Sequence, residues 1–266
     1  MPRRDDAPDF IEAIARGLDV IRCFSPAQPV MGLSDVAAAT GLARPTARRI
    51  LLTLETLGYV RAVAGGGFAL TPRVLELGTA YVQAMGLWDV ARPHLEQLVA
   101  KTGESSSIAQ LDGSDIVYVS RVAVPKIIAL AVSIGTRFPA PATSLGKVLL
   151  AGLPPGELAG VLAQPSRAGV TARWQPDRAE LDAVLRDVRA KGWALTDEQL
   201  APGIRSVAAP LRDGAGRVIA AVNVTVHAAE TSVETLLTRY LPLLLHTAGE
   251  ISADFARRDA LPQATA

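Results

Sequence analysis

The chain has 266 residues, 49% of them hydrophobic and 20% charged, which suffices for two folded domains and is not typical of a disordered protein. A net charge of +1 argues against a general polyanion binder, and a single cysteine excludes an intramolecular disulfide. No apolar run reaches the roughly 20 residues of a membrane span, and the polar start lacks a signal peptide, so we expect a cytoplasmic protein with no membrane partner. The three histidines lie far apart, and we expect no metal site and no cofactor.

The first seventy residues predict a series of short helices. Residues 1–9 are polar and contain proline, and we expect them to be disordered. From Phe10 a helical period begins, and the residues expected on its buried face are Ile11, Ile14, Leu18, Ile21 and Phe24. Ser34 is the expected N-cap of a second short helix that ends at Gly41.

A third helix is expected from Pro45 to Leu57. Its expected buried stripe is Ala47, Ile50, Leu51, Leu54 and Leu57, which leaves Arg44, Thr46, Arg48, Arg49 and Thr53 on or near its other faces. Two helices joined by a Gly-containing turn, with arginines at the start of the second, are typical of a DNA-binding helix-turn-helix. Arginine binds guanine or phosphate, and threonine binds phosphate or a base edge. An ordinary solvated helix face and a plain helical bundle remain alternatives at this point.

A hairpin is expected directly after this helix. Residues 59–63 and 68–70 have the character of strands, and the glycines at 65–67 mark the turn between them. Such a hairpin forms a wing, with Arg61 at its base. The order of helix, helix, glycine turn, basic helix and hairpin is more specific than any of its parts.

A linking helix is expected from Arg73 onward. Its apolar side, at roughly heptad spacing, consists of Val74, Leu77, Tyr81, Ala84 and Met85. This side could pack on its own domain or pair with the same helix of a second chain. We favour pairing, because a helix between two domains has little core of its own.

The remainder predicts an α+β domain with a mostly antiparallel sheet and helices packed to one side. The expected helices span residues 90–101, 143–153, 155–163, 177–191 and 231–257. The expected strands span residues 105–111, 116–122, 127–134, 206–212 and 218–226.

Two segments of this domain are candidates for ligand binding. In the first, small and hydroxyl residues lead into the helix at Thr143 and Ser144, where free N–H groups and the helix dipole favour a carboxylate. A plain N-cap is the alternative. In the second, Asn223, Thr225 and His227 share one strand face, which forms a pocket wall or faces water. Arg137 and Arg205 are candidate partners of a ligand carboxylate, although structural roles fit them equally well.

The residues quoted next resemble the IclR family of transcription regulators. The N-terminal segments are IARGLDVI (14–21), LSDVAAATGL (33–42), RPTARRIL (44–51) and LGYV (57–60). The later segments are ATSLGK (142–147), GWALTDE (192–198) and PGIRSVAAPL (202–211). The resemblance covers residues 10–257. It implies a winged helix-turn-helix followed by an effector domain similar to GAF and PAS sensors. One departure is the wing tip, which has three glycines where related wings carry basic residues.

In the family, the residues that match Arg44, Thr46, Arg48 and Arg49 lie on the helix that meets DNA. Those that match Ser144, Leu145, Thr196, Ile204, Ser206, Asn223 and Thr225 line the effector pocket. The pattern of the residues themselves adds the other members of the two sets below. The expected DNA-binding residues are Arg44, Pro45, Thr46, Arg48, Arg49, Thr53 and Arg61. The expected effector-binding residues are Arg137, Thr143, Ser144, Leu145, Gly146, Thr196, Asp197, Ile204, Arg205, Ser206, Asn223 and Thr225. Family members are dimers or dimers of dimers, which implies a palindromic operator.

Five further segments, 75–78, 103–107, 115–119, 135–140 and 223–228, are similar to the PcaR/PcaU/PobR branch of the family. That branch controls the breakdown of aromatic compounds through the β-ketoadipate pathway. It implies a small organic acid effector such as protocatechuate, 4-hydroxybenzoate or β-ketoadipate.

The expected domains are a disordered start (1–9), a DNA-binding domain (10–72), a dimerisation helix (73–88), an effector domain (89–258) and a disordered tail (259–266). Two other functions compete with a regulator. Ser144, Asp197 and His227 follow the chain order of a serine hydrolase triad, but the expected hairpins do not match the parallel sheet of that fold, so we expect no enzyme. A sensor or scaffold without DNA binding is the other alternative.

Overall fold

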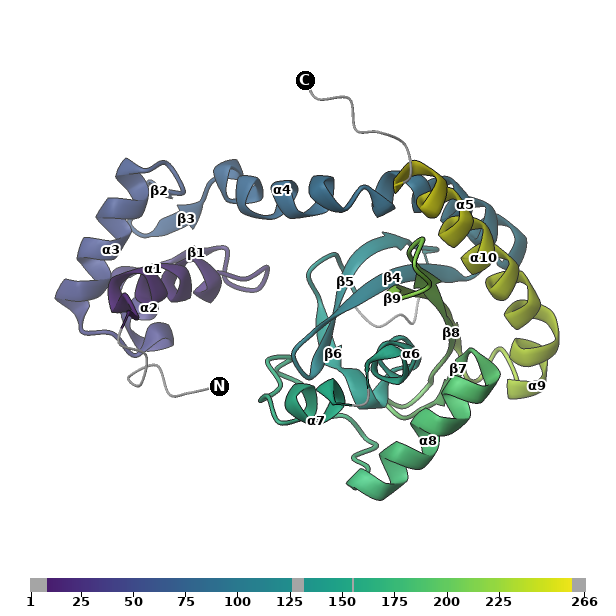
Figure 1. Cartoon of the computed structure of the whole chain (residues 1–266). Coiled ribbons are helices and arrows are strands. Elements are labelled where there is room, and N and C mark those ends of the chain that lie inside the picture. The colour runs from purple at the N-terminus through teal and green to yellow at the C-terminus, as the bar shows by residue number, and fades with distance from the viewer. Residues whose placement is uncertain (1–8, 126–131, 155, 260–266) are drawn as a thin grey trace. The chain divides into compact units, whose positions relative to one another are not determined.

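The computed structural model describes residues 9–125, 132–154 and 156–259 (Figure 1). The chain divides into two compact units, Met1–Ala84 and Met85–Ala266. The segments expected to be disordered lie outside the described residues, apart from Asp9 in a turn and Asp259 at the end of the last helix. The finer division into domains at residues 72 and 88 stays a prediction.

The first unit is a winged helix-turn-helix. Its elements are α1 (Glu12–Cys23), β1 (Val30–Met31), α2 (Leu33–Thr40), α3 (Arg44–Thr56), β2 (Val60–Ala62), β3 (Phe68–Leu70), the 3-10 helix η2 (Pro72–Leu75) and α4 (Glu76–Met85). The strands form one antiparallel sheet in the order β1-β3-β2. The hairpin of β2 and β3 was predicted, whereas β1 has only two residues and leaves no alternating pattern to detect.

The prediction for the buried face of α1 was wrong in part. Val20 is fully buried and packs with Phe24 in the core of this unit, whereas Ile11, Ile14 and Leu18 are exposed. The helix has apolar residues on more than one side, and periodicity alone does not tell which side packs inside the unit.

Helix α2 begins two residues before the expected position. Gly32 is the N-cap, and its N–H donates to Asp35 Oδ2 at 3.0 Å, so Ser34 lies inside the first turn and not at the cap. Helix α3 begins at Arg44, one residue before the expected start, and Leu57 follows its end and is exposed, so the buried stripe stops at Leu54.

The second unit is an α+β domain. Its helices are α5 (Leu87–Thr102), η3 (Ala140–Ala142), α6 (Ser144–Gly152), α7 (Glu157–Leu162), α8 (Arg178–Lys191), α9 (Val233–Thr235), the π-helix η4 (Leu236–Tyr240) and α10 (Leu241–Asp259). Its strands are β4 (Ser105–Asp112), β5 (Asp115–Val122), β6 (Arg137–Pro139), β7 (Ala194–Asp197), β8 (Ile204–Arg212) and β9 (Val218–His227). All neighbouring strands are antiparallel, in the order β6-β5-β4-β9-β8-β7, which confirms the predicted fold class.

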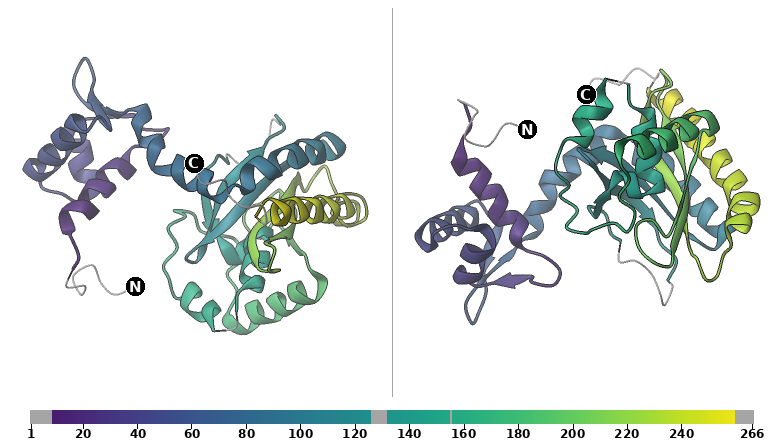
Figure 2. Two further views of the ribbon diagram at one scale, coloured as in Figure 1. Left: turned by 45° about the horizontal axis from the view of Figure 1, so that its top comes forward. Right: turned by 90° about the horizontal axis from the view of Figure 1, so that it is seen from below.

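The sheet is covered on both faces, so the expectation of helices on one side was wrong. It curls around α6, which contacts five of its strands, while α5 and α10 lie side by side on the outer face (Figures 1 and 2). Nearly every residue of α6 is buried. Gly146 is essential to this packing, because a Cβ at this position would stand 2.1 Å from the carbonyl oxygen of Ala140.

The strand expected at 127–134 is not supported in the part that the structure describes. Residues 127–131 lie outside the described residues, and residues 132–134 form no strand. The short strands β6 and β7, at the two edges of the sheet, were not predicted. Each has only three or four residues, too few for a periodic signal.

Candidate functional site

The polar residues of α3 do not share one face. At about 100° per residue, Arg49 lies opposite the buried residues Ala47, Leu51 and Leu54, and Pro45 lies close to it. Arg44 and Arg48 lie on one flank. Thr46 and Thr53 lie on the other flank, where both line a groove beside α1. Arg49 also lines this groove, and it is the arginine of α3 farthest around the helix from the buried stripe. A duplex that lay along the exposed face of α3 would therefore meet it first.

The hydroxyl of Thr53 is partly occupied within the helix. Its Oγ1 donates to the carbonyl oxygen of Arg49 at 2.8 Å, which leaves it only acceptor capacity for an outside group. The predicted residues Arg44, Pro45, Arg48 and Arg49 are exposed, as is Arg61 on β2.

The wing tip has no side chain beyond Cα with which to contact DNA. Gly65, Gly66 and Gly67 all have positive φ values, between 90° and 113°, which only glycine adopts readily. The N–H of Gly66 donates to the carbonyl of Val63 at 3.1 Å and is used within the turn. Any wing contact by a side chain therefore depends on Arg61.

In the second unit a small cavity of about 60 Å³ lies between the N-terminus of α6 and the inner face of the sheet. The predicted residues that line it are Thr143, Ser144, Leu145, Thr196, Ile204, Ser206, Asn223 and Thr225. They come from α6, β7, β8 and β9, which are far apart in the sequence. The polar face of β9 thus forms a pocket wall and does not face bulk water.

A chain of buried hydroxyls crosses one wall of this cavity. Ser206 Oγ lies 2.7 Å from Ser144 Oγ and 2.9 Å from Thr196 Oγ1. Three hydroxyl protons serve two hydrogen bonds, so one O–H remains to donate elsewhere. The opening of α6 is partly self-capped, because the N–H of Gly146 donates to Thr143 Oγ1 at 2.9 Å.

Asn223 is bound into the sheet. Its Oδ1 accepts from the N–H of Ser107 at 3.0 Å, and its Nδ2 donates to Thr225 Oγ1 at 2.9 Å. These bonds fix the amide, so that Thr225 keeps its hydroxyl proton for another acceptor.

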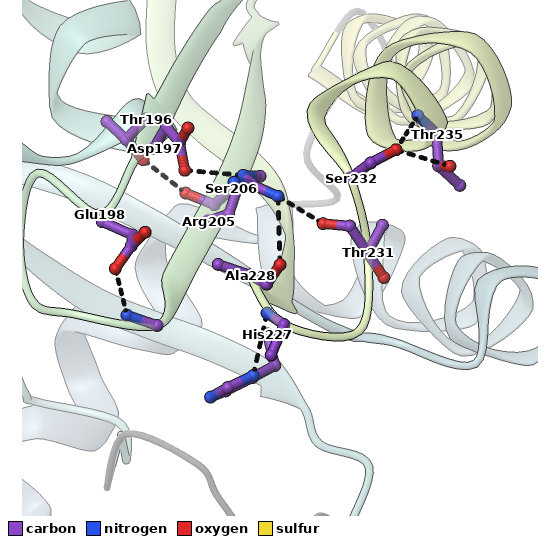
Figure 3. Close-up of polar contacts among 12 residues, drawn as sticks. Thr196, Asp197, Glu198, Arg205, Ser206, His227, Ala228, Thr231, Ser232 and Thr235 are labelled. Atoms are coloured by element: carbon purple, nitrogen blue, oxygen red, sulfur yellow. Dashed lines mark hydrogen bonds and ion pairs between the residues drawn. The ribbon is translucent and has the colours of Figure 1, made fainter.

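Four predicted effector-binding residues do not line the cavity, and Figure 3 shows two of them, Asp197 and Arg205. Arg205 lies between Ile204 and Ser206, so strand alternation turns it to the other face of the sheet. Its Nε pairs with Asp197 Oδ1 at 2.7 Å, and its guanidinium also donates to the carbonyls of Ala228 and Thr231. This arginine ties β7, β8 and the turn after β9 together.

Arg137 and Gly146 are the other two. Arg137 pairs with Asp112 Oδ2 at 2.6 Å and with the buried carboxylate of Asp115 at 3.4 Å, so it holds the β4–β5 turn. Gly146 serves the packing of α6 against η3. Neither residue presents a free group to the cavity.

Sequence reasoning missed Tyr118 and Arg121, which both line the cavity. They are three residues apart on β5, so a regular strand would place them on opposite faces. The pairing of β4 with β5 shifts register between Ile108 and Ala109, with Ser120 opposite the first and Tyr118 opposite the second. Val119 is thus the extra residue of a β-bulge, which turns Tyr118 and Arg121 to the same face.

Burial affects both side chains. It raises the pKa of Tyr118 to about 12 and lowers the pKa of the Arg121 guanidinium below its ordinary value. At neutral pH the phenol is protonated and the guanidinium is charged. Glu104, Ser105, Val124, Val132, Ala142, Leu200, Val226 and His227 complete the lining.

The hydrolase arrangement is not formed. Ser144 bonds to Ser206, Asp197 pairs with Arg205, and His227 Nδ1 accepts from the N–H of Ala229 at 3.3 Å. Asp197 also faces away from the cavity. Within the described ranges, no cluster of three His, Cys, Asp or Glu side chains is placed to hold a metal ion, and no helix has the length and hydropathy to cross a membrane.

Comparison with known families gives two matches. Residues 79–253 match the model described as bacterial transcriptional regulator IclR, C-terminal, and residues 13–64 match the IclR helix-turn-helix domain. Together they span both units.

Two characterised relatives are similar over most of the chain. The Pca regulon regulatory protein of Pseudomonas putida is 37% identical over 90% of this chain and 82% of its own length. The p-hydroxybenzoate hydroxylase transcriptional activator of Acinetobacter baylyi is 33% identical over 91% of each chain. Both are regulators and not enzymes, and they place the chain near the Pca and p-hydroxybenzoate branch.

Two solved structures are also similar. A transcriptional regulator of Rhodococcus sp. RHA1 is 49% identical, with a TM-score of 0.81 over 94% of this chain and 100% of that one. The inducer-binding domain of PobR from Acinetobacter, solved as a double mutant with 3-hydroxybenzoic acid, is 31% identical. It has a TM-score of 0.56 over 62% of this chain and 97% of that one.

Proposed function

The chain belongs to the IclR family of DNA-binding transcriptional regulators, and from this premise we propose that an aromatic acid bound in the cavity of the second unit controls the affinity of the protein for an operator. The observation that carries the proposal is the pairing of an exposed, arginine-bearing helix α3 with a separate polar cavity in one chain. The first element suits DNA and the second suits a small ligand.

The proposed DNA surface is centred on Arg49. This side chain lies opposite the buried stripe of α3, with Pro45 beside it and Arg48 and Arg44 on one flank. An arginine in this position can fork onto guanine or pair with phosphate. Thr46, Thr53 and Arg61 are proposed to contact the flanking backbone.

Arg49→Ala tests this surface. We expect weaker binding to the promoter of its own gene and, if a phosphate contact is lost, a salt dependence smaller by about one unit of slope. Gel shifts at several salt concentrations measure both, and Arg92→Ala on the exposed face of α5 is the matched control. Unchanged affinity and slope would remove Arg49 from the interface. Failure of the native protein to prefer its promoter over random duplex would refute DNA regulation by this chain.

The proposed ligand is a small aromatic acid. The relatives are named for the Pca regulon and for p-hydroxybenzoate hydroxylase, and the PobR domain was solved with 3-hydroxybenzoic acid. The cavity of this chain carries hydroxyls from Ser144, Thr196 and Ser206 beside apolar walls from Leu145 and Ile204. Such a mixture suits an aromatic ring with polar substituents.

The size of the cavity bears on how the ligand would act. A cavity of roughly 150 Å³ holds benzene, whereas this one measures about 60 Å³. An aromatic acid therefore requires its walls to move apart. A ligand that binds only the opened form shifts the population toward that form, and this is the requirement for a switch.

Calorimetry with 4-hydroxybenzoate, protocatechuate and β-ketoadipate tests the ligand proposal. We expect at least one acid to bind and to change operator affinity, and by linkage the operator changes the affinity for that acid by the same factor. No heat and no thermal stabilisation with any of the three would contradict the aromatic-acid proposal.

We further propose that the protein acts as a dimer, or a dimer of dimers, in the cytoplasm on a palindromic operator. Leu77 and Tyr81 are each more than half exposed on one side of α4, an apolar stripe that a second copy would cover. A two-fold dimer would present two α3 helices to two half-sites. Light scattering after size exclusion measures the mass, and a monomer at micromolar concentration would contradict this proposal.

A further inference from the structure

The bulge at Val119 gives the cavity a feature that a regular strand would not have. It places the guanidinium of Arg121 and the phenol of Tyr118 on the inner face of the sheet, where both line the cavity. Bulges commonly re-aim side chains next to binding sites.

Arg121 carries a charge that no carboxylate in the described ranges balances. Its NH1 donates to Ser107 Oγ at 3.0 Å, and no acidic side chain of the described residues lies within ion-pair distance. By contrast, Arg137 and Arg205 each have an aspartate partner. A half-buried guanidinium with spare donors favours an anionic partner from outside.

Tyr118 supplies a second unused donor. Its side chain is almost fully buried and packs edge-on against Phe138, with ring centroids 5.9 Å apart. Among the residues that the structure describes, no acceptor lies within hydrogen-bond distance of its hydroxyl. Because the side chain lines the cavity, this O–H is available to an acceptor on a ligand there.

We propose that Arg121 and Tyr118 form the carboxylate-binding subsite of the cavity, and that the chain of Ser144, Ser206 and Thr196 hydroxyls receives the other polar end of the ligand. This inference rests on the proposed function, because it assigns the group of the acid that each wall recognises. It implies a ligand with a carboxylate at one end and a second hydrogen-bonding group at the other.

The other ionisable groups at the cavity do not replace this pair. Glu104 also lines the cavity, and it is not an unpaired charge. His227 has its Nδ1 engaged by the N–H of Ala229, and its Nε2 lies against Gly203. Arg121 is thus the guanidinium available to an acid among the described lining residues.

The test compares each acid with its neutral amide, using calorimetry on the full chain. For the native protein we expect 4-hydroxybenzoate or protocatechuate to bind at least 10-fold more tightly than the amide. Arg121→Gln should lower the affinity for the acid by about 10- to 100-fold, because a hydrogen bond to a charged group is lost. The affinity for the amide should change by less than about threefold. Arg121→Lys should retain part of the preference.

Tyr118→Phe removes only the hydroxyl, and we expect it to lower acid affinity by about 10-fold. Arg92→Gln, on the exposed face of α5, is the control for a lost surface charge and should change nothing. Tryptophan fluorescence checks folding. If Arg121→Gln does not fold, Arg121→Lys and Tyr118→Phe decide the question.

Equal losses for acid and amide, or unchanged acid affinity in Arg121→Gln, would overturn the subsite while leaving the proposed function intact. A native protein that binds its promoter and none of the acids would instead refute the ligand proposal itself, and the subsite with it. The two failures are therefore distinguishable in one set of titrations.

Discussion

The stability of the second unit should depend on pH through a single buried lysine. Lys147 is only 2% exposed and lies in α6, one turn beyond the cavity. Its ammonium donates to Gln199 Oε1 and to the carbonyl of Leu195, and it lies 4.5 Å from the centre of the Trp174 ring. Desolvation outweighs these contacts and the nearby charge of Glu180, and lowers the pKa of Lys147 from 10.5 to about 8.

This shift determines the direction of the pH dependence. Between pH 8 and pH 10.5 the unfolded chain holds a proton on Lys147 that the folded chain has released, so the free energy of unfolding rises with pH. The slope is about 1.4 kcal/mol per pH unit. From pH 8 to pH 10.5, a span of about 2.5 pH units, the free energy of unfolding increases by about 3 kcal/mol. Below pH 8 Lys147 is charged in the folded state, and the full cost of its desolvation lowers the free energy of unfolding.

Urea unfolding from pH 7 to pH 10, followed by tryptophan fluorescence, measures this effect. All three tryptophans, Trp88, Trp174 and Trp193, lie in the second unit, so the signal reports on that unit alone. Lys147→Met should abolish the rise, whereas Lys101→Met, at an exposed position near the end of α5, should retain it. Equal slopes in the native protein and Lys147→Met would refute the reasoning.

Three further predictions concern packing, assembly and the outer face of the sheet. Gly146→Ala should lower the free energy of unfolding by more than about 2 kcal/mol, because its Cβ would overlap a backbone carbonyl, whereas Gly160→Ala, with open space around it, should be neutral or stabilising in denaturant titrations. Equal effects of the two would contradict the close packing of α6. Leu77→Asp should convert the dimer to a monomer in light scattering, and a retained dimer would place the interface elsewhere. Arg205→Ala should destabilise the second unit by about 1–3 kcal/mol, since two backbone carbonyls and Asp197 lose their donor. It should leave acid affinity within threefold in calorimetry, and a larger loss would return Arg205 to the ligand site.

The fold was predicted where local signals are strong. The wing at 65–67 and the turn at Gly113 have glycines that a hairpin requires, and the strands beside them were placed correctly. The errors fall where tertiary contacts decide. Ile14 and Leu18 keep a helical period but face outward, because the core of the first unit packs on Val20 instead.

The candidate cavity was predicted in part for the same reason. Ser144 and Thr196 stand in recognisable segments, whereas Tyr118 and Arg121 depend on a bulge that strand alternation does not reveal. Arg205 shows the opposite case. Its position beside Ser206 in a signature segment made it a candidate, yet alternation along β8 directs it to the other face. The sequence alone does not show whether an arginine has an aspartate as an ion-pair partner.

The glycine-only wing tip affects which parts of an operator this regulator can recognise. Three successive glycines provide no side chain that could enter the minor groove, and Arg61 lies at the base of the wing. Discrimination between DNA sites would then come from the few side chains on the exposed face of α3, each of which would contact one or two base pairs in the major groove. We expect aligned binding sites to show two short blocks of fixed bases, with freely varying flanks.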